Sequence, residues 1–213
     1  EGDKLEFKSP HFSGGIGIIF MNKNLKIKED FVSTSATINC HFIQGGFCDV
    51  LSNKQSEYVV NFVDNRNNKL MTRVEINNNC YAKCFYSYFI PYRVQVSNIN
   101  EGGLIFDYLL NLTNQRVYIH LDSKSLGDTI AWFPYVEEFG LKHNCQVICS
   151  TFWNDLFRNE YSNIEFVNPG SVVNDIFAMY EVGVFHNEFK EPHDYRKIPL
   201  QQVSSNILGL EHK

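Results

Sequence analysis

The stretch that decides the fold begins with Arg116-Val117-Tyr118-Ile119-His120-Leu121, a compact run of apolar and β-branched side chains. Two similar runs follow, Gln146-Val147-Ile148-Cys149 and Ile164-Glu165-Phe166-Val167, the second of them closed by Pro169-Gly170. Short apolar runs bounded by polar and turn-forming residues are typical of buried strands. The sequence therefore predicts three strands in this part of the chain.

The segments between these strands predict helices. Residues 130–143 carry apolar side chains at helical spacing, namely Ile130, Phe133, Val136 and Phe139, with Trp132 and Leu141 broadening the stripe. Residues 153–159 predict a second, short helix, in which Trp153 is expected to pack between helix and sheet. Strand, helix, strand, helix, strand is the alternation of a doubly wound parallel sheet. Such a sheet places its ligand at the carboxyl ends of its strands.

The first half of the chain has a different texture. Short alternating or apolar runs at 37–43, 57–63, 70–76, 92–96 and 104–110 predict strands. The turns between them are polar and rich in Asn, as at 64–69 and 77–79. We therefore expect an α/β protein with two domains: a small antiparallel β sandwich or barrel over residues 1–114, with a partly irregular amino terminus, and a Rossmann-like parallel α/β domain over residues 115–213.

Composition and charge argue against two classes of function, nucleic-acid binding and membrane insertion. The formal net charge of the 213 residues is −5, with no dense cluster of Lys and Arg, which argues against nucleic acid as a partner. No stretch approaches the roughly 20 apolar residues that a membrane span needs. The first residues, Glu1-Gly2-Asp3-Lys4, lack the basic-then-apolar pattern of a signal peptide. We therefore expect a cytoplasmic protein without a membrane span.

The six cysteines are expected to be reduced thiols. Cys80 and Cys84 are four residues apart, as are Cys145 and Cys149, and four thiolates can in principle bind iron or zinc. Apolar packing on one side of a strand explains the same spacing without a metal. The sequence thus favours no metal site.

The loop from Asp122 to Thr129 carries the candidate chemistry, because it joins the first parallel strand to its crossover helix. Gly127 permits a close backbone approach, and the start of the helix offers unpaired N–H groups. Asp128 places a carboxylate at that mouth, where it can act as a general base toward an acceptor hydroxyl. The alternative is that Asp128 only caps the helix. The loop matches neither a P-loop nor a dinucleotide-binding glycine pattern.

The residues on both sides of the loop give a more specific signal than the loop alone. The run from Val117 to Phe139 resembles the bacterial autotransporter heptosyltransferase family, and the resemblance continues through Cys149–Asn154, Tyr180–Gly183 and Ile198–Gln201. Upstream, Phe42–Gly45 and Tyr88–Val94 are similar to the small β domain of that family. The likeness covers about residues 34–212.

The resemblance implies the amino-terminal, acceptor-side lobe of a two-lobed GT-B glycosyltransferase. Such an enzyme transfers heptose from ADP-heptose to serine hydroxyls of autotransporter adhesins, a protein O-glycosylation. By analogy Asp128 is the general base of a direct, inverting displacement. The surrounding loop then contacts the substrates through Ser123, Lys124, Ser125, Gly127 and Thr129. A lipopolysaccharide heptosyltransferase fits the Gly-Asp pair but not the added β domain.

Members of the family continue into a second lobe that holds most nucleotide contacts and a cysteine-bound iron. This sequence stops at Leu208–Lys213, about where the linker to that lobe is expected. We therefore expect no cofactor in this chain, and a homo-oligomer or association with a separate donor lobe. The alternative is a non-catalytic module that binds an adhesin or builds an assembly.

Overall fold

The computed structural model describes residues 19–20 and 36–213, so the irregular amino terminus expected from the sequence lies outside the described residues. The described chain divides into two compact units. The β unit comprises residues 36–86 and 90–111, and the α/β unit comprises residues 19–20, 87–89 and 112–213. Each unit has its own apolar core.

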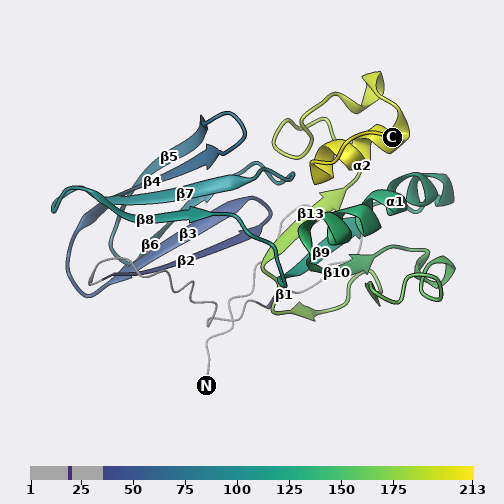
Figure 1. Ribbon diagram of the computed structural model, residues 1–213, viewed down its shortest axis with the longest axis horizontal. Helices are drawn as coiled ribbons and strands as arrows, with labels where there is room; N and C mark the ends of the chain where they lie inside the picture. Colours follow the sequence, from purple (N-terminus) through teal and green to yellow (C-terminus); the bar gives the residue numbers. More distant parts are fainter. Residues whose placement is uncertain (1–18, 21–35) are drawn as a thin grey trace. The chain divides into compact units, whose positions relative to one another are not determined.

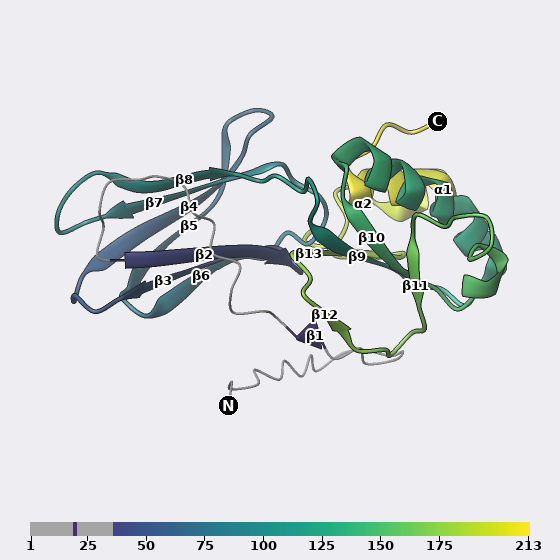
Figure 2. The same ribbon diagram turned by 60° about the horizontal axis from the view of Figure 1, so that its bottom comes forward.

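The β unit contains two antiparallel sheets (Figures 1 and 2). One sheet has the order β2-β3-β6, with bounds β2 (Ala36–Ile43), β3 (Gly46–Ser52) and β6 (Cys80–Cys84). The other has the order β5-β4-β7-β8, with bounds β4 (Glu57–Asp64), β5 (Lys69–Asn77), β7 (Tyr92–Asn98) and β8 (Leu104–Leu109). The ring of Phe42 on β2 stacks on that of Tyr92 on β7 with centroids 5.7 Å apart, so the sheets share one aromatic core.

Two strands of the β unit were not predicted. Strand β3 buries Gly46, Cys48, Val50 and Ser52, which alternate in the correct period but are small or weakly apolar. Position 46 requires a glycine, because a Cβ atom there would lie 2.8 Å from the ring of Phe62. Strand β6 is short and exposes Cys80 and Tyr81, which hides its alternation.

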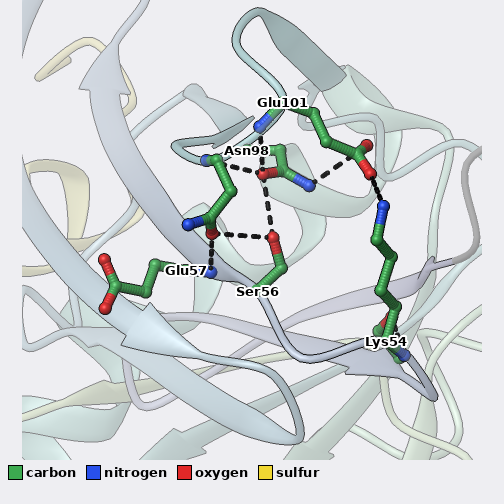
Figure 3. A network of polar contacts seen from close by, with 7 residues as sticks. Lys54, Ser56, Glu57, Asn98 and Glu101 are labelled. Atoms are coloured by element: carbon green, nitrogen blue, oxygen red, sulfur yellow. Dashed lines mark hydrogen bonds and ion pairs between the residues drawn. The ribbon is translucent and has the colours of Figure 1, made fainter.

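A polar network closes one end of the four-stranded sheet (Figure 3). The hydroxyl of Ser56 lies 2.9 Å from the Oδ1 atoms of both Asn98 and Asn100. Oδ1 of Asn98 also accepts from the backbone N–H groups of Asn100 and Glu101, at 3.0 and 3.1 Å. The Glu101 carboxylate forms an ion pair with Lys54. Buried Asn98 therefore fixes the β7–β8 turn against the segment that enters β4.

The α/β unit has a parallel sheet in the order β11-β10-β9-β13 (Figure 2). The bounds are β9 (Arg116–Leu121), β10 (Gln146–Ser150), β11 (Glu165–Val167) and β13 (Ala178–Val182). Helices α1 (Leu126–His143) and α2 (Leu200–Leu208) pack on each other and on this sheet. A separate parallel pair joins β1 (Ile19–Phe20) to β12 (Val173–Asn174). The α/β fold class expected from the sequence is confirmed, because the described chain combines helices with parallel and antiparallel strands.

Helix α1 begins at Leu126, earlier than the apolar stripe predicted, because Ser125 is its N-cap. The buried face carries Trp132, Phe133, Val136 and Phe139, but Ile130 is 55% exposed and Leu141 is 69% exposed. The predicted inclusion of Ile130 and Leu141 in the core stripe was therefore wrong. The helix contains Pro134, and it ends at Asn144 in the left-handed conformation, with a φ of 48°.

Two further elements differ from expectation. The helix predicted at 153–159 was wrong, since only a 3₁₀ turn, η1 (Asn154–Leu156), forms there. The side chains of Thr151 and Asn154 bond to nearby backbone N–H groups, which competes with helix formation. Helix α2 and the 3₁₀ turn η2 (Tyr195–Lys197) were not predicted. Neither helix in the described part of the chain is long and apolar enough to cross a membrane.

Candidate functional site

The candidate site lies at the carboxyl edge of the parallel sheet. In the strand register, Ser150 at the end of β10 and Glu181 on β13 both pair with His120 on β9. Beyond His120, the chain leaves the sheet and reaches the loop 122–125, which leads directly into α1. This is the edge at which parallel α/β sheets bind their ligands.

Asp128 occupies the first turn of α1, where the helix start carries a partial positive charge. The hydroxyl of Ser123 donates to its Oδ2 atom at 2.6 Å. Oδ1 has no partner among the residues that the structure describes. The carboxylate is half-exposed, so a hydroxyl-bearing ligand can reach it. The carboxylate is thus oriented by one hydrogen bond and accessible to a ligand.

Asp128 is not the helix cap. The cap is Ser125, whose hydroxyl accepts from the backbone N–H of Asp128 at 3.4 Å. The backbone N–H of Ser125 donates in turn to the Ser123 hydroxyl at 3.0 Å. Ser125, and not Asp128, therefore caps the helix, and the Asp128 carboxylate is available for another role.

The other predicted residues lie in the same loop with different degrees of access. Thr129 is fully buried, and its hydroxyl donates to the carbonyl oxygen of Ser125 at 3.1 Å. Lys124 is exposed, and its ammonium lies 5.6 Å from the centroid of the Phe152 ring. Gly127 is exposed, and a Cβ atom there would meet only the Ser125 hydroxyl, at an ordinary 3.7 Å. The structure thus brings Ser123 and Ser125 closest to Asp128.

A second group at this edge was missed by sequence reasoning. The indole N–H of Trp153 donates to the carbonyl oxygen of Lys124 at 3.1 Å. The backbone N–H of Trp153 donates to Oγ1 of Thr151 at 2.8 Å, and that of Thr151 donates to Oδ1 of Asn154 at 3.0 Å. Trp153 is 37% exposed, so its expected packing between helix and sheet was wrong. The Thr-Phe-Trp-Asn sequence after an apolar strand was the available signal.

Charged side chains border the same edge. Nε2 of His120 lies 3.7 Å from Oδ1 of Asp122. His120, opposed by burial and assisted by Lys190, holds the pKa of Asp122 below its ordinary value. Lys190 also forms a 3.0 Å ion pair with the largely buried Glu181. Nearby Glu191 is only 3% exposed, and its burial raises its pKa to about 7.

An open groove of about 800 Å³ runs along the outer side of α1 and has Gly127 and Asp128 in its lining. Its lining is mainly apolar along the helix and includes the exposed side chains of Ile130 and Leu141. Leu200 and Gln201 of α2 also contribute to it. The groove is thus open to solvent and reaches the candidate base.

The cysteines do not form a metal centre in the described residues, which contain no group of three or more Cys, His, Asp or Glu side chains that could hold a metal ion. Cys84 and Cys149 are buried, whereas Cys80 is exposed. Burial raises the pKa of Cys145 to about 11 and that of Cys149 still further. In the absence of a metal, these two thiols are therefore neutral near pH 7.

Comparison with known proteins places this geometry in context. The chain is 28% identical over 162 residues to the autotransporter heptosyltransferase BAHTCr of Citrobacter rodentium (strain ICC168), covering 74% of this chain and 39% of that protein. It is 31% identical over 129 residues to the autotransporter heptosyltransferase TibC of Escherichia coli O78:H11 (strain H10407, ETEC), covering 58% of this chain and 32% of that protein. No family model matches the chain.

The fold agrees with the sequence comparison. The crystal structure of TibC, described as a bacterial iron-containing dodecameric glycosyltransferase from enterotoxigenic E. coli H10407, superposes with a TM-score of 0.74 at 25% identity. The match covers 86% of this chain and 49% of that one. TibC has also been solved in complex with ADP-D-β-D-heptose. The chain is thus homologous to autotransporter heptosyltransferases and spans less than half the length of the curated relatives that it matches.

Proposed function

We propose that this chain is the acceptor-side part of a protein O-heptosyltransferase, which transfers heptose from ADP-heptose to serine hydroxyls of autotransporter adhesins. Homology to BAHTCr and TibC supports the reaction class, and the complex of TibC with ADP-heptose supports the donor. The observation that carries the proposal is the half-exposed Asp128 carboxylate at the carboxyl edge of the sheet, oriented by the Ser123 hydroxyl.

Asp128 would act as the general base of a single displacement. Its Oδ1 atom accepts the proton of the acceptor serine as the serine oxygen attacks the anomeric carbon of the heptose. The bond from that carbon to the diphosphate breaks at the same time, and ADP leaves with the electron pair. One carboxylate suffices for this inverting route, because no glycosyl–enzyme intermediate has to form.

The loop residues would have distinct parts in substrate binding. Lys124 is exposed and carries the positive charge that a diphosphate requires. Gly127 leaves the helix start open to a close approach. Ser123 and Ser125 hold the loop, and buried Thr129 supports it from below through the Ser125 carbonyl.

We further propose that the α/β unit forms the acceptor-side lobe of a GT-B enzyme, with the β unit, residues 36–86 and 90–111, as its β domain. The enzyme would act in the cytoplasm, where a sugar nucleotide is available. A donor lobe, in the same or another chain, would supply most nucleotide contacts. Iron, which TibC contains, would be held outside the described residues, in which no three or more Cys, His, Asp or Glu side chains gather. The dodecameric TibC supports a homo-oligomer.

A second candidate function is a non-catalytic module that binds an adhesin or builds an assembly. It is favoured by the open groove on α1, which suits a polypeptide.

The deciding experiment measures transfer from ADP-heptose to a serine-rich adhesin fragment by intact-protein mass spectrometry. The 213-residue chain is tested alone and with a donor lobe from a relative such as TibC, each beside Asp128→Asn. Asparagine keeps the size of the side chain and an acceptor for Ser123, so loss of heptose addition in the variant identifies the base. We expect a loss of at least about 100-fold. Adhesin binding without any transfer would support the assembly module instead.

A further inference from the structure

The loop 122–125 receives a hydrogen bond from outside the loop. Lys124 lies between Ser123, which bonds to the Asp128 carboxylate, and Ser125, which caps α1. Its carbonyl oxygen accepts from the indole N–H of Trp153, which comes from the segment after the neighbouring strand β10. A shift of Lys124 would therefore move both residues that contact Asp128.

Trp153 is itself held by buried neighbours. Its backbone N–H is bonded to the hydroxyl of Thr151, which is 1% exposed, and Thr151 is bonded in turn to Asn154, which is 5% exposed. The amide group of Asn154 donates to the carbonyl oxygen of Val167 at 2.8 Å, at the end of β11. A continuous set of hydrogen bonds thus links the ends of β11 and β10 to the loop after β9.

The indole contributes little to the core. Of the two tryptophans in the chain, Trp132 is fully buried and Trp153 is 37% exposed. Adjacent Phe152 is similarly exposed, at 39%, and its ring lies 5.6 Å from the Lys124 ammonium, but the ring has no N–H group to donate to the Lys124 carbonyl oxygen. Phe152 therefore serves as a matched reference for the effect of losing an exposed aromatic ring at this edge.

We propose that Trp153 is a positioning residue, whose indole N–H fixes the Lys124 carbonyl and thereby sets the place of the Asp128 carboxylate relative to the acceptor hydroxyl. The kinetic part of this inference rests on the proposed transfer function, whereas the structural part does not. The residue acts through Lys124 and Ser123, without contact with the substrate. Its loss should therefore lower kcat and leave KM nearly unchanged.

The first test is hydrogen exchange on the 213-residue chain, which needs no activity. In Trp153→Phe, which removes the donor and keeps a ring, the amides of 122–129 should exchange at least about tenfold faster, as expected when local opening becomes easier. Those of 132–143 should be unchanged. Phe152→Leu should leave both segments unchanged. Equal protection of 122–129 in wild type and Trp153→Phe would overturn the inference.

The second test is kinetic, on the 213-residue chain combined with a donor lobe from a relative such as TibC, with ADP-heptose and an adhesin fragment. Trp153→Phe should lower kcat by up to about 100-fold, the loss expected for a misplacement near 1 Å. Phe152→Leu should lower it by less than about threefold. A change confined to KM, or equal losses in the two variants, would contradict a positioning role.

A second variant covers the case in which phenylalanine disturbs folding. Benzothienylalanine at position 153 has the shape of tryptophan, with sulfur in place of the N–H group, and it should reproduce both the faster exchange and the lower kcat. Normal protection and kcat with this residue would refute the inference. If wild type transfers no heptose but the exchange difference is present, the proposed function fails and the placement of the loop by Trp153 stands.

Discussion

The hydroxyl of Ser123 donates a 2.6 Å hydrogen bond to Oδ2 of Asp128, joining the segment that leaves strand β9 to the first turn of helix α1. The cap of the same helix is a different serine, Ser125. Orientation of the carboxylate and stability of the helix are thus assigned to two side chains of one type, only two positions apart. These roles can be separated by mutation.

Ser123→Ala and Ser125→Ala should have opposite profiles. Ser123→Ala removes the donor that orients Asp128 and the acceptor of the exposed Ser125 N–H. We expect a loss of about tenfold in kcat and a smaller loss of stability than at the cap, because water can replace both hydrogen bonds. Ser125→Ala removes the N-cap and should lower the free energy of unfolding by about 1 kcal/mol. Transfer kinetics and urea denaturation of both variants check this assignment. Indistinguishable profiles would show that the two serines share one role.

Glu191→Gln should change how stability depends on pH. In the folded chain, burial raises the pKa of Glu191 to about 7, whereas the ordinary value is 4.5. Between about pH 4.5 and pH 7 the folded state therefore binds more protons at this side chain than the unfolded state does. The contribution of Glu191 to the free energy of unfolding is therefore fully present below about pH 4.5 and is lost as the pH rises to about 7.

Glutamine mimics the protonated carboxyl and keeps an oxygen for the backbone N–H of Phe185, which lies 3.4 Å from Oε2. At pH 8 the variant should be more stable than wild type by about 1–2 kcal/mol, since each pKa unit corresponds to at most about 1.4 kcal/mol. At pH 4 the two should be equally stable. Urea titrations across this range provide the comparison, and a constant difference at every pH would contradict the assignment.

Gly45→Ala should be much more destabilising than Gly102→Ala, although both glycines have positive φ angles, 105° and 73°. A Cβ atom on Gly45 would lie 2.1 Å from the backbone carbonyl oxygen of Cys84, which cannot move without breaking strand pairing. At Gly102 the same atom would meet nothing within 4 Å. We expect about 1–2 kcal/mol for the backbone strain at Gly102 and more than about 3 kcal/mol at Gly45. Similar midpoints in thermal unfolding would refute this difference.

Asn98→Ala should destabilise the β unit by about 1–3 kcal/mol, because two backbone N–H groups of the β7–β8 turn lose their acceptor (Figure 3). Lys54→Ala breaks an ion pair at the rim of the same network, where both side chains are largely exposed. Surface ion pairs contribute little, so stability should stay within error. Circular dichroism during denaturation measures both variants, and equal losses would show that the rim pair carries the turn.

The elements that could be predicted are those with a strong local signal. Strands β9 and β10 are continuous apolar runs, and α1 has large aromatic side chains at helical spacing. Strand β3 could not be predicted, because its buried side chains are small and its glycine is required by the ring of Phe62 across the core. Helix α2 buries two serines, Ser204 and Ser205, at positions where a pattern of apolar residues is sought.

The candidate site could be predicted only in part, because some of its contacts are not local in the sequence. The sequence placed Asp128 at the start of a helix after a parallel strand, because strand order and helix start are local properties. Its partner could not be chosen, since Ser123 and Ser125 are equivalent by type, and only the path of the loop distinguishes them. The contact from Trp153 depends on the lateral neighbour of β9 in the sheet, which no local pattern specifies.

The assignment of residues 87–89 to the α/β unit has a consequence for recombination between related genes. The backbone N–H of Phe89 donates to the carbonyl oxygen of Ile207 at 2.8 Å, and its ring packs edge-on against Phe139 with centroids 5.6 Å apart. A single crossover near residue 111 would take the parallel sheet and Phe139 from one parent and Phe89 from the other. The contact between Phe89 and Phe139 would then join residues from different parents. Productive chimeras should therefore inherit residues 87–89 and 112–213 from the same parent.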